Sequence, residues 1–211
     1  MSQSDEGTER MAEADADIIR AVLSGEVDRY AALVERYQAP TIRVAFSLLG
    51  NCEEARDVAQ EAWVSAYRAL GHFRGRAKFS TWLYRIVINK CKDASKRRAR
   101  QPAIVGRVGW SDASMDATET LFVDPEDPTA NPSDHAANHE LSRQLSAAIG
   151  TLSGHQLTVF VLHHLHGLTL EAVAETLGCR VGTVKSHLFR ATKQLRRQLT
   201  PWLRSETVAH A

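Results

Sequence analysis

The stretch that decides the fold is residues 168–199, LTLEAVAETLGCRVGTVKSHLFRATKQLRRQL. It predicts two helices joined by a tight turn, because Gly178 interrupts a helical pattern that resumes near Val181. At about 100° per residue, the apolar residues of the second helix fall on one stripe: Val181, Val184, Leu188, Ala191, Leu195 and Leu199. Together with the small Ala174 in the first helix, this spacing is typical of a helix-turn-helix.

The face opposite that stripe carries hydrogen-bonding and cationic side chains. Directly opposite the stripe lie Thr183, Ser186, Arg190 and Arg197, while Lys185 flanks this face on one side and His187 on the other. Further along the helix come Lys193 and Arg196, as well as Arg197. A helix that enters the major groove needs this arrangement, with base contacts near its start and phosphate contacts later. The alternative is an ordinary helical hairpin with a basic surface. Phe189, on the polar side of the helix, is evidence against this alternative, because an exposed aromatic side chain is unusual unless it contacts a partner.

Helical periodicity also dominates the N-terminal part and predicts helices over residues 15–24, 27–49, 52–70 and 79–98. Residues 1–14 are small, polar and acidic, so we expect them to be disordered. Residues 101–138 hold four of the six prolines and seven acidic residues against one basic residue, which is typical of a flexible acidic linker. We therefore predict an all-α chain, with two small helical domains, 15–100 and 139–205, joined by that linker.

Composition excludes several classes of protein. No apolar run is long enough to span a bilayer, and the N-terminal MSQSDEGTER is not a signal peptide. The three cysteines are widely spaced, which excludes a disulfide framework and favours a reducing cytoplasm. Signatures of nucleotide-binding loops, zinc proteases and nucleophile elbows are missing from the sequence, so nothing indicates an enzyme or a cofactor.

Charge is distributed unevenly, although the formal net charge is only +1. Between residues 72 and 100 there are ten basic residues and one acidic residue, and between residues 180 and 204 there are seven basic residues and no acidic one. Two basic blocks on either side of an acidic linker indicate polyanion binding at two places. Either block alone could equally be a solvated helix face.

Helix 52–70 has an acidic face opposite its apolar arc. Asp57, Gln60 and Glu61 share that face with Val64, an apolar residue outside the core stripe. A face that docks on another protein would use this valine, whereas a solvated face would not need it. The alternative is an exposed polar face with one stray valine.

Helix 79–98 combines a broad apolar arc with a stripe of Thr81, Arg85, Asn89, Lys92 and Lys96, edged by Trp82. The loop before it carries Phe73, two glycines and three cations, Arg74, Arg76 and Lys78. Cations and amides beside aromatic rings suit single-stranded nucleic acid, and such a loop can surround an extruded base. We expect Phe79 and Tyr84 to belong to the core. For Phe73 and Trp82, a core role and a nucleic-acid role are equally supported.

These segments, in this order, resemble the sigma-70 family, and specifically its small extracytoplasmic-function (group IV) members. Residues 57–61, DVAQE, resemble the DxxQE of conserved region 2.2. Residues 79–86, FSTWLYRI, with Asn89 resemble regions 2.3 and 2.4, and residues 182–191 resemble the recognition helix of region 4.2. The resemblance covers about four fifths of the chain and makes 15–100 a region 2 bundle and 139–205 a region 4 helix-turn-helix.

The resemblance implies a promoter-specificity subunit of RNA polymerase without catalysis of its own, in a stress or envelope response. It implies that Asp57, Gln60, Glu61 and Val64 dock on the clamp helices of the β′ subunit, and that region 4 meets the β flap. It implies −10 recognition and melting by Phe73, Arg74, Arg76, Lys78, Trp82, Arg85, Asn89, Lys92 and Lys96. It implies −35 recognition by Thr183, Lys185, Ser186, His187, Arg190, Lys193 and Arg197.

Some residues depart from the family pattern. Arg56 replaces a common acidic residue, Trp63 a common phenylalanine, and His187 a common arginine. His163, His164 and His166 form an unusual cluster. A zinc site with Cys179 is conceivable, but adjacent helical positions point about 100° apart, so we expect no metal and read these histidines as surface or partner-facing.

The resemblance also implies a cytoplasmic protein, not itself embedded in a membrane, and an anti-sigma factor that could hold it at the membrane. The competing hypothesis is a conventional helix-turn-helix regulator with a sensing or dimerising N-terminal domain. Such a regulator would bind promoter DNA without core polymerase and would not need the acidic face around Asp57.

Overall fold

The computed structural model describes residues 14–100, 143–145 and 147–209, and every regular element among them is helical. The predicted linker lies outside these residues, as does the predicted disordered N-terminus except Ala14, which is helical. After helical residues 14–23 come η1 (Val27–Arg29), α2 (Tyr30–Leu49), α3 (Cys52–Ala69), η2 (Leu70–His72) and α4 (Phe79–Arg100). After helical residues 143–145 and 147–150 come α7 (Gly154–Phe160), the π-helical turn η3 (Val161–Leu165), α8 (Leu170–Leu177) and α9 (Val181–Ala209).

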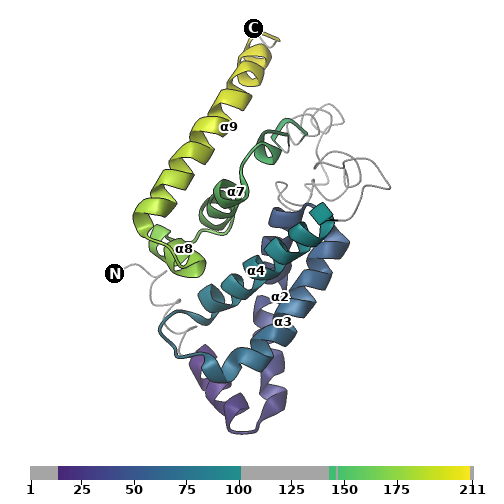
Figure 1. Cartoon of the computed structure of the whole chain (residues 1–211), viewed down its shortest axis with the longest axis vertical. Helices are drawn as coiled ribbons and strands as arrows, with labels where there is room; N and C mark the ends of the chain where they lie inside the picture. Colours follow the sequence, from purple (N-terminus) through teal and green to yellow (C-terminus); the bar gives the residue numbers. More distant parts are fainter. Residues whose placement is uncertain (1–13, 101–142, 146, 210–211) are drawn as a thin grey trace.

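The N-terminal half is a bundle in which α2, α3 and α4 pack against one another (Figure 1). Its centre is apolar, and its largest fully buried side chains include Leu33, Val44, Val58, Leu70, Phe79, Leu83, Val87 and Ile88. Phe79 and Tyr84, at 2% and 8% exposed, are core residues as predicted. Trp63 is also buried, and its backbone carbonyl accepts a hydrogen bond from the Tyr30 hydroxyl at 3.0 Å.

Local signals explain where these helices begin and end. Gly50 ends α2 at φ 69°, a left-handed conformation that glycine adopts without strain. Asn51 then caps α3, since its side-chain oxygen accepts a hydrogen bond from the Glu54 amide at 2.8 Å. The predicted helix 27–49 is thus η1 followed by α2. The predicted helix 52–70 ends one residue early as α3, and the predicted helix 79–98 continues to Arg100 as α4.

A buried carboxylate attaches the first helical segment to the bundle. Asp15 is 3% exposed, accepts a hydrogen bond from the Tyr37 hydroxyl, and forms an ion pair with Arg36 of the same helix, α2. Because a buried charge needs such partners, residues 14–23 are held against α2 by specific contacts as well as by Ile18, Ile19 and Val22.

The C-terminal half confirms the predicted helix-turn-helix. Thr169 caps α8 by accepting from the Ala172 amide at 3.2 Å, and Gly178 ends it at φ 65°. Val184 and Ala191 of α9 are fully buried, as the wheel predicted. The α7 helix, opened by a capping box between Ser153 and Gln156, also packs against α9, where Leu157 and Val161 share a buried cluster with Ala191 and Leu195.

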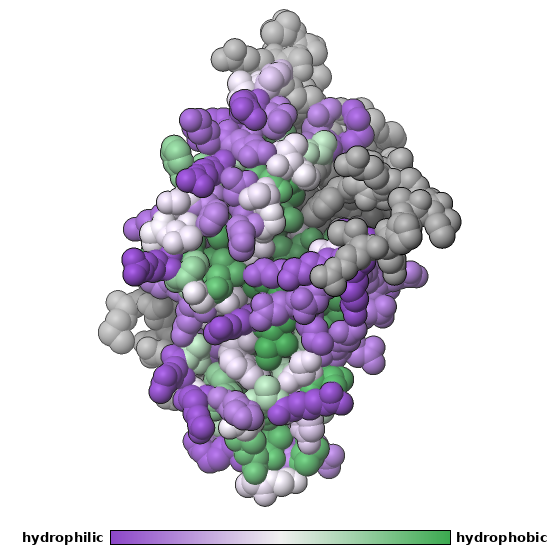
Figure 2. Space-filling model, viewed as in Figure 1, coloured by the Kyte–Doolittle hydropathy of each residue, from purple (hydrophilic) through white to green (hydrophobic). Residues whose placement is uncertain are grey.

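The two halves lie in contact. The α8 helix packs against α4 (Figure 1), and η3 packs against α2. In the face drawn in Figure 2, hydrophilic side chains cover most of the surface, and hydrophobic residues show through between them along the middle. The sequence predicted both halves but not their contact.

Candidate functional site

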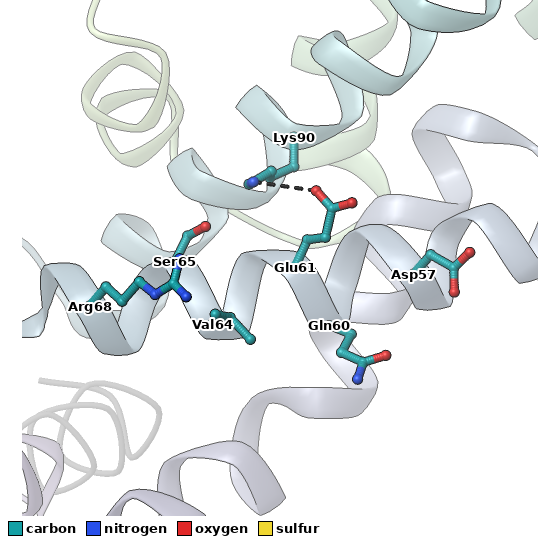
Figure 3. Close-up of a pocket in the computed structure, with 7 residues that line it drawn as sticks. All are labelled: Asp57, Gln60, Glu61, Val64, Ser65, Arg68 and Lys90. Atoms are coloured by element: carbon teal, nitrogen blue, oxygen red, sulfur yellow. Dashed lines mark hydrogen bonds and ion pairs between the residues drawn. The ribbon is translucent and has the colours of Figure 1, made fainter.

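The acidic face of α3 lines a shallow hollow. Asp57, Gln60 and Glu61 are exposed on it, Val64 is 47% exposed, and Ser65, Arg68 and Lys90 complete the lining (Figure 3). The structure therefore brings the four predicted docking residues together on one accessible surface. The exposed valine gives that surface an apolar contact among charged and amide groups, which is the composition of a protein-docking patch.

Basic residues of α4 border this face. Lys90 Nζ donates to Glu61 Oε2 at 3.3 Å (Figure 3). Arg97 lies 4.0 Å from the other carboxylate oxygen. Sequence reasoning missed Lys90 because the side chain comes from another helix. The only sign of Lys90 in the sequence was its position within the basic block of residues 72–100. Both ion pairs are partly exposed, so they orient Glu61 more than they stabilise the fold.

The cationic stripe of α4 is accessible. Arg85, Asn89, Lys92 and Lys96 are exposed, as are Arg74, Arg76 and Lys78 of the preceding loop. Thr81, which the wheel placed on the same stripe, is instead 6% exposed and belongs to the interior. The stripe that can meet a ligand therefore begins one turn later, at Arg85.

Two aromatic residues lie between core and surface. Phe73 and Trp82 are half-buried, with ring centroids 5.3 Å apart, and each also packs on Phe79, at 5.9 and 5.7 Å. Both therefore have a packing role in an aromatic cluster. Each also keeps part of its ring accessible beside the cationic loop, which is the geometry a stacking base needs.

The outer face of α9 is exposed as predicted. Thr183, Lys185, Ser186, Arg190, Lys193 and Arg197 are all exposed, opposite the buried Val184 and Ala191. Ser186 Oγ donates to the Gly182 carbonyl at 3.0 Å, which leaves its lone pairs free to accept. Phe189, at 69%, is the most exposed large hydrophobic side chain in the described part of the chain.

His187 differs from its neighbours on this face. It is half-buried, and its ring stacks against that of His155, with centroids 5.6 Å apart. His155 comes from the start of α7 and was not a sequence prediction, because only the packing of α7 on α9 brings the two rings together. The pair places a second imidazole beside the predicted DNA-reading face.

The three clustered histidines do not share one environment. His164 is largely exposed, but the partial burial of its ring, together with the neighbouring His163, lowers its pKa. His163 Nδ1 donates to the Leu168 carbonyl at 2.8 Å. The surface interpretation is wrong for His166, which is half-buried and faces Tyr84 of α4 within the chain. Burial, aided by Arg43, lowers the pKa of His166 to about 4.

Across the described ranges, no three or more histidine, cysteine or carboxylate side chains are grouped so that they could hold a metal ion. Within the same ranges, no helix combines the length and the apolar character needed to cross a bilayer.

Family models match both halves of the chain. The model for sigma-70 region 2 matches residues 33–101, and the model for sigma-70 region 4 matches residues 142–195. The first range contains the α3 face and the α4 stripe, and the second contains the helix-turn-helix.

Curated relatives match nearly end to end. The RNA polymerase sigma-H factor of Pseudomonas aeruginosa is 33% identical over 91% of this chain and 97% of its own length. The ECF RNA polymerase sigma factor SigW of Bacillus subtilis is 34% identical over 86% of this chain and 94% of its own length.

Solved structures share the fold at lower identity. CnrH in complex with the cytosolic domain of CnrY has a TM-score of 0.62 at 22% identity, covering 89% of this chain and 98% of the other. RpoE of Bartonella quintana, in complex with the anti-sigma factor NepR, has a TM-score of 0.56 at 20% identity, covering 80% of this chain and 97% of the other. Matched in both regions and along most of its length, the chain belongs to the sigma-70 family, as an extracytoplasmic-function RNA polymerase sigma factor.

Proposed function

We propose that this sigma factor divides its work among three surfaces: the α3 face, the α4 stripe with its preceding loop, and the start of α9. One observation carries the proposal. Each surface is an exposed polar face opposite a buried apolar stripe, so each can bind a partner without disturbing the fold.

The α3 face is the surface for core polymerase. Asp57, Gln60 and Glu61 offer charge and hydrogen bonds, and Val64 supplies the apolar centre that a protein partner covers. We assign the β′ clamp helices as its partner, and the β flap as the partner of the C-terminal half, from the family resemblance. Lys90 and Arg97 hold the Glu61 carboxylate toward this face.

The α4 stripe and the loop before it are the surface for the −10 element. Arg85, Lys92 and Lys96 neutralise phosphates of the opened strand, and Asn89 hydrogen-bonds an extruded base. Arg74, Arg76 and Lys78 surround it, and the accessible edges of Phe73 and Trp82 give it a stacking surface.

The start of α9 is the surface for the −35 element in the major groove. Thr183, Ser186 and Arg190 face the bases, and Lys193 and Arg197 meet phosphates where the helix leaves the groove. Lys185 and His187 flank this face.

Regulation by an anti-sigma factor is part of the proposal. A structural neighbour, RpoE of Bartonella quintana, was solved with the anti-sigma factor NepR, which supports such a partner here. A role in a stress or envelope response, action in the cytoplasm and tethering to the membrane through that partner stay predictions from the resemblance.

The competing hypothesis, a conventional helix-turn-helix regulator, gives no role to the α3 face. Gel filtration of the chain with core RNA polymerase separates the two hypotheses. The proposal predicts comigration with core polymerase in the absence of DNA. A conventional regulator would elute alone and bind duplex promoter DNA without polymerase.

A further inference from the structure

The residues that open α7 are fixed against the flank of α9 at two levels. The α7 helix lies beside α9 (Figure 1), and the rings of His155 and His187 stack with centroids 5.6 Å apart and an interplanar angle of 27°. Further along α9, Gln194 Nε2 donates to the Thr151 carbonyl at 2.7 Å and to the Thr151 hydroxyl at 3.0 Å. Because His187 and Gln194 are seven residues apart, they share one edge of α9, and residues 151–155 follow that edge.

A buried seam holds this segment in place. Its apolar side chains belong to the same cluster as those of α9, which includes Leu152, Leu157, Val161, Ala191 and Leu195. The capping box closes the backbone just before His155, since the Ser153 amide donates to Gln156 Oε1 at 3.0 Å. His155 is exposed at the end of this segment. Its place beside α9 is therefore set by packing and hydrogen bonds on both sides of the chain.

The edge that carries the stacked histidines borders the proposed reading face. Around α9, His187 and Gln194 lie about 60° and 40° from Arg190, at about 100° per residue. His187 also lies about 40° from Thr183 on the same side. Thr183 and Arg190 are both exposed, and both face the bases in the proposed docking. His155 therefore extends the −35 surface sideways, from α9 onto α7.

DNA geometry indicates what His155 would meet there. The major groove is about 12 Å wide, and a helix with its side chains is about 10–12 Å across. A helix in the groove fills it, so a group on the helix flank faces the sugar–phosphate strand that forms the wall of the groove. Imidazole carries an N–H donor in either neutral tautomer and two donors when protonated. A phosphate oxygen, the usual acceptor for such positioning contacts, is therefore the ligand that suits His155.

We propose that His155 is a further DNA-contacting residue of this sigma factor, which donates a hydrogen bond to a backbone phosphate of the −35 element while His187 supports its ring. The inference rests on the proposed function of α9. It adds α7 to the −35 surface and gives the stacked pair one joint role. A phosphate contact carries no base information, so His155 contributes to affinity and to the position of the helix rather than to the choice of sequence.

Affinity of the holoenzyme for promoter DNA is the first test. The probe is a promoter that the holoenzyme selects from DNA with randomised −35 and −10 segments, together with its single-base −35 variants. His155→Ala should weaken the Kd about three- to tenfold on all of them alike, the effect of one net hydrogen bond. Because His155 is exposed, the melting temperature of the variant should stay within about 2 °C of the parent.

A fixed charge at the same position gives a second, independent readout. At pH 8, where histidine is ordinarily neutral, His155→Arg presents a permanent cation to the same phosphate. The slope of log affinity against log salt concentration should then become steeper by roughly one. His164→Arg is the matched control, since His164 is an exposed histidine whose ring packs against Phe160 and His163. Its salt slope should be that of the parent.

A scan of neutral phosphates separates a contact from a structural role. One uncharged methylphosphonate replaces each backbone phosphate of the −35 element in turn. At one position, the parent should lose at least about threefold more affinity than His155→Ala loses, because the variant no longer uses that phosphate. His187→Ala should also lose less than the parent there, since the ring of His155 has lost its support. A merely structural role would give equal losses in parent and variant at every position.

The outcomes distinguish the inference from the proposed function. Equal losses at every phosphate, or a parent-like salt slope for His155→Arg, would overturn the contact while binding that depends on the −35 element persists. A full loss in His187→Ala at the phosphate of His155 would overturn the supporting role of His187. If the parent holoenzyme bound promoters with intact and substituted −35 elements equally, the proposed function of α9 would be refuted, and the inference with it.

Discussion

Reversing a single charge on the α3 face should separate polymerase binding from folding. Asp57→Arg changes an exposed residue that, within the described part of the chain, makes no ion pair, so its effect on the free energy of unfolding should stay within about 0.5 kcal/mol. Glu61→Arg removes the ion pairs with Lys90 and Arg97 and adds a like charge beside both. Because exposed pairs contribute about 0.2–1 kcal/mol, the total loss should be near 1 kcal/mol.

The two variants should therefore melt differently but bind alike. For a chain of this size, 1 kcal/mol corresponds to a fall in melting temperature of about 2–4 °C for Glu61→Arg, with little change for Asp57→Arg. A reversed charge that becomes buried against a partner costs about 2–4 kcal/mol, which is a roughly 30- to 1,000-fold weaker Kd for core polymerase in either variant.

The assay is titration of fluorescently labelled chain with core RNA polymerase, beside thermal melting of the same samples. Glu53→Arg is the matched control, since Glu53 is an exposed acid on the same helix that does not line the hollow. It should keep the parent Kd. Parent-like binding by both Asp57→Arg and Glu61→Arg, or equal loss in Glu53→Arg, would refute the assignment of this face.

Other perturbations address the remaining surfaces and the buried histidine. Asn89→Ala and Phe73→Ala should impair opening of the −10 region more than initial −35 binding, because base capture acts only once the base leaves the stack. Permanganate footprinting should then show lost thymine reactivity. Reactivity at the parent level would mean that both residues are structural. In a competition assay with holoenzyme on single-base −35 variants, Arg190→Ala should relax the preference at one position by about 1–3 kcal/mol. Lys193→Ala should instead weaken binding to every promoter variant and lower the slope of log affinity against log salt concentration by roughly one. Equal losses on every promoter variant with Arg190→Ala would mean that Arg190 contacts the DNA backbone. His166, with a pKa near 4 in the folded chain against 6.5 when free, takes up its proton more readily once unfolded. Its contribution is therefore present above pH 6.5 and falls by up to about 3 kcal/mol as pH drops toward 4, so melting at pH 7.5 and pH 5 should show a larger loss in the parent than in His166→Gln.

The sequence predicted best those features that depend on the residues of one helix alone. The stripe of α9 could be predicted because Val184 and Ala191 recur at helical spacing, and Gly178 marks a turn that needs a left-handed residue. The faces of α3 and α9 follow from the same reasoning, since a residue opposite a buried stripe must be exposed.

Features that depend on contact between distant segments could not be predicted. A helical wheel cannot tell that the first turn of α4 is covered, so it misplaced Thr81. Lys90 reaches Glu61 and His155 reaches His187 only through tertiary packing. His166 belonged, in sequence, to a surface cluster, and the packing of the two halves places it beside Tyr84 instead.

The central claim is that this chain makes core RNA polymerase specific for its promoters. Run-off transcription tests it most directly, with core polymerase alone and with the chain added, on a promoter that the holoenzyme selects from DNA with randomised −35 and −10 segments. The account predicts one discrete transcript that requires the chain, and that disappears both with Asp57→Arg and with a substituted −35 element. A transcript of equal yield without the chain, or promoter binding by the chain that leaves transcription by core polymerase unchanged, would contradict it.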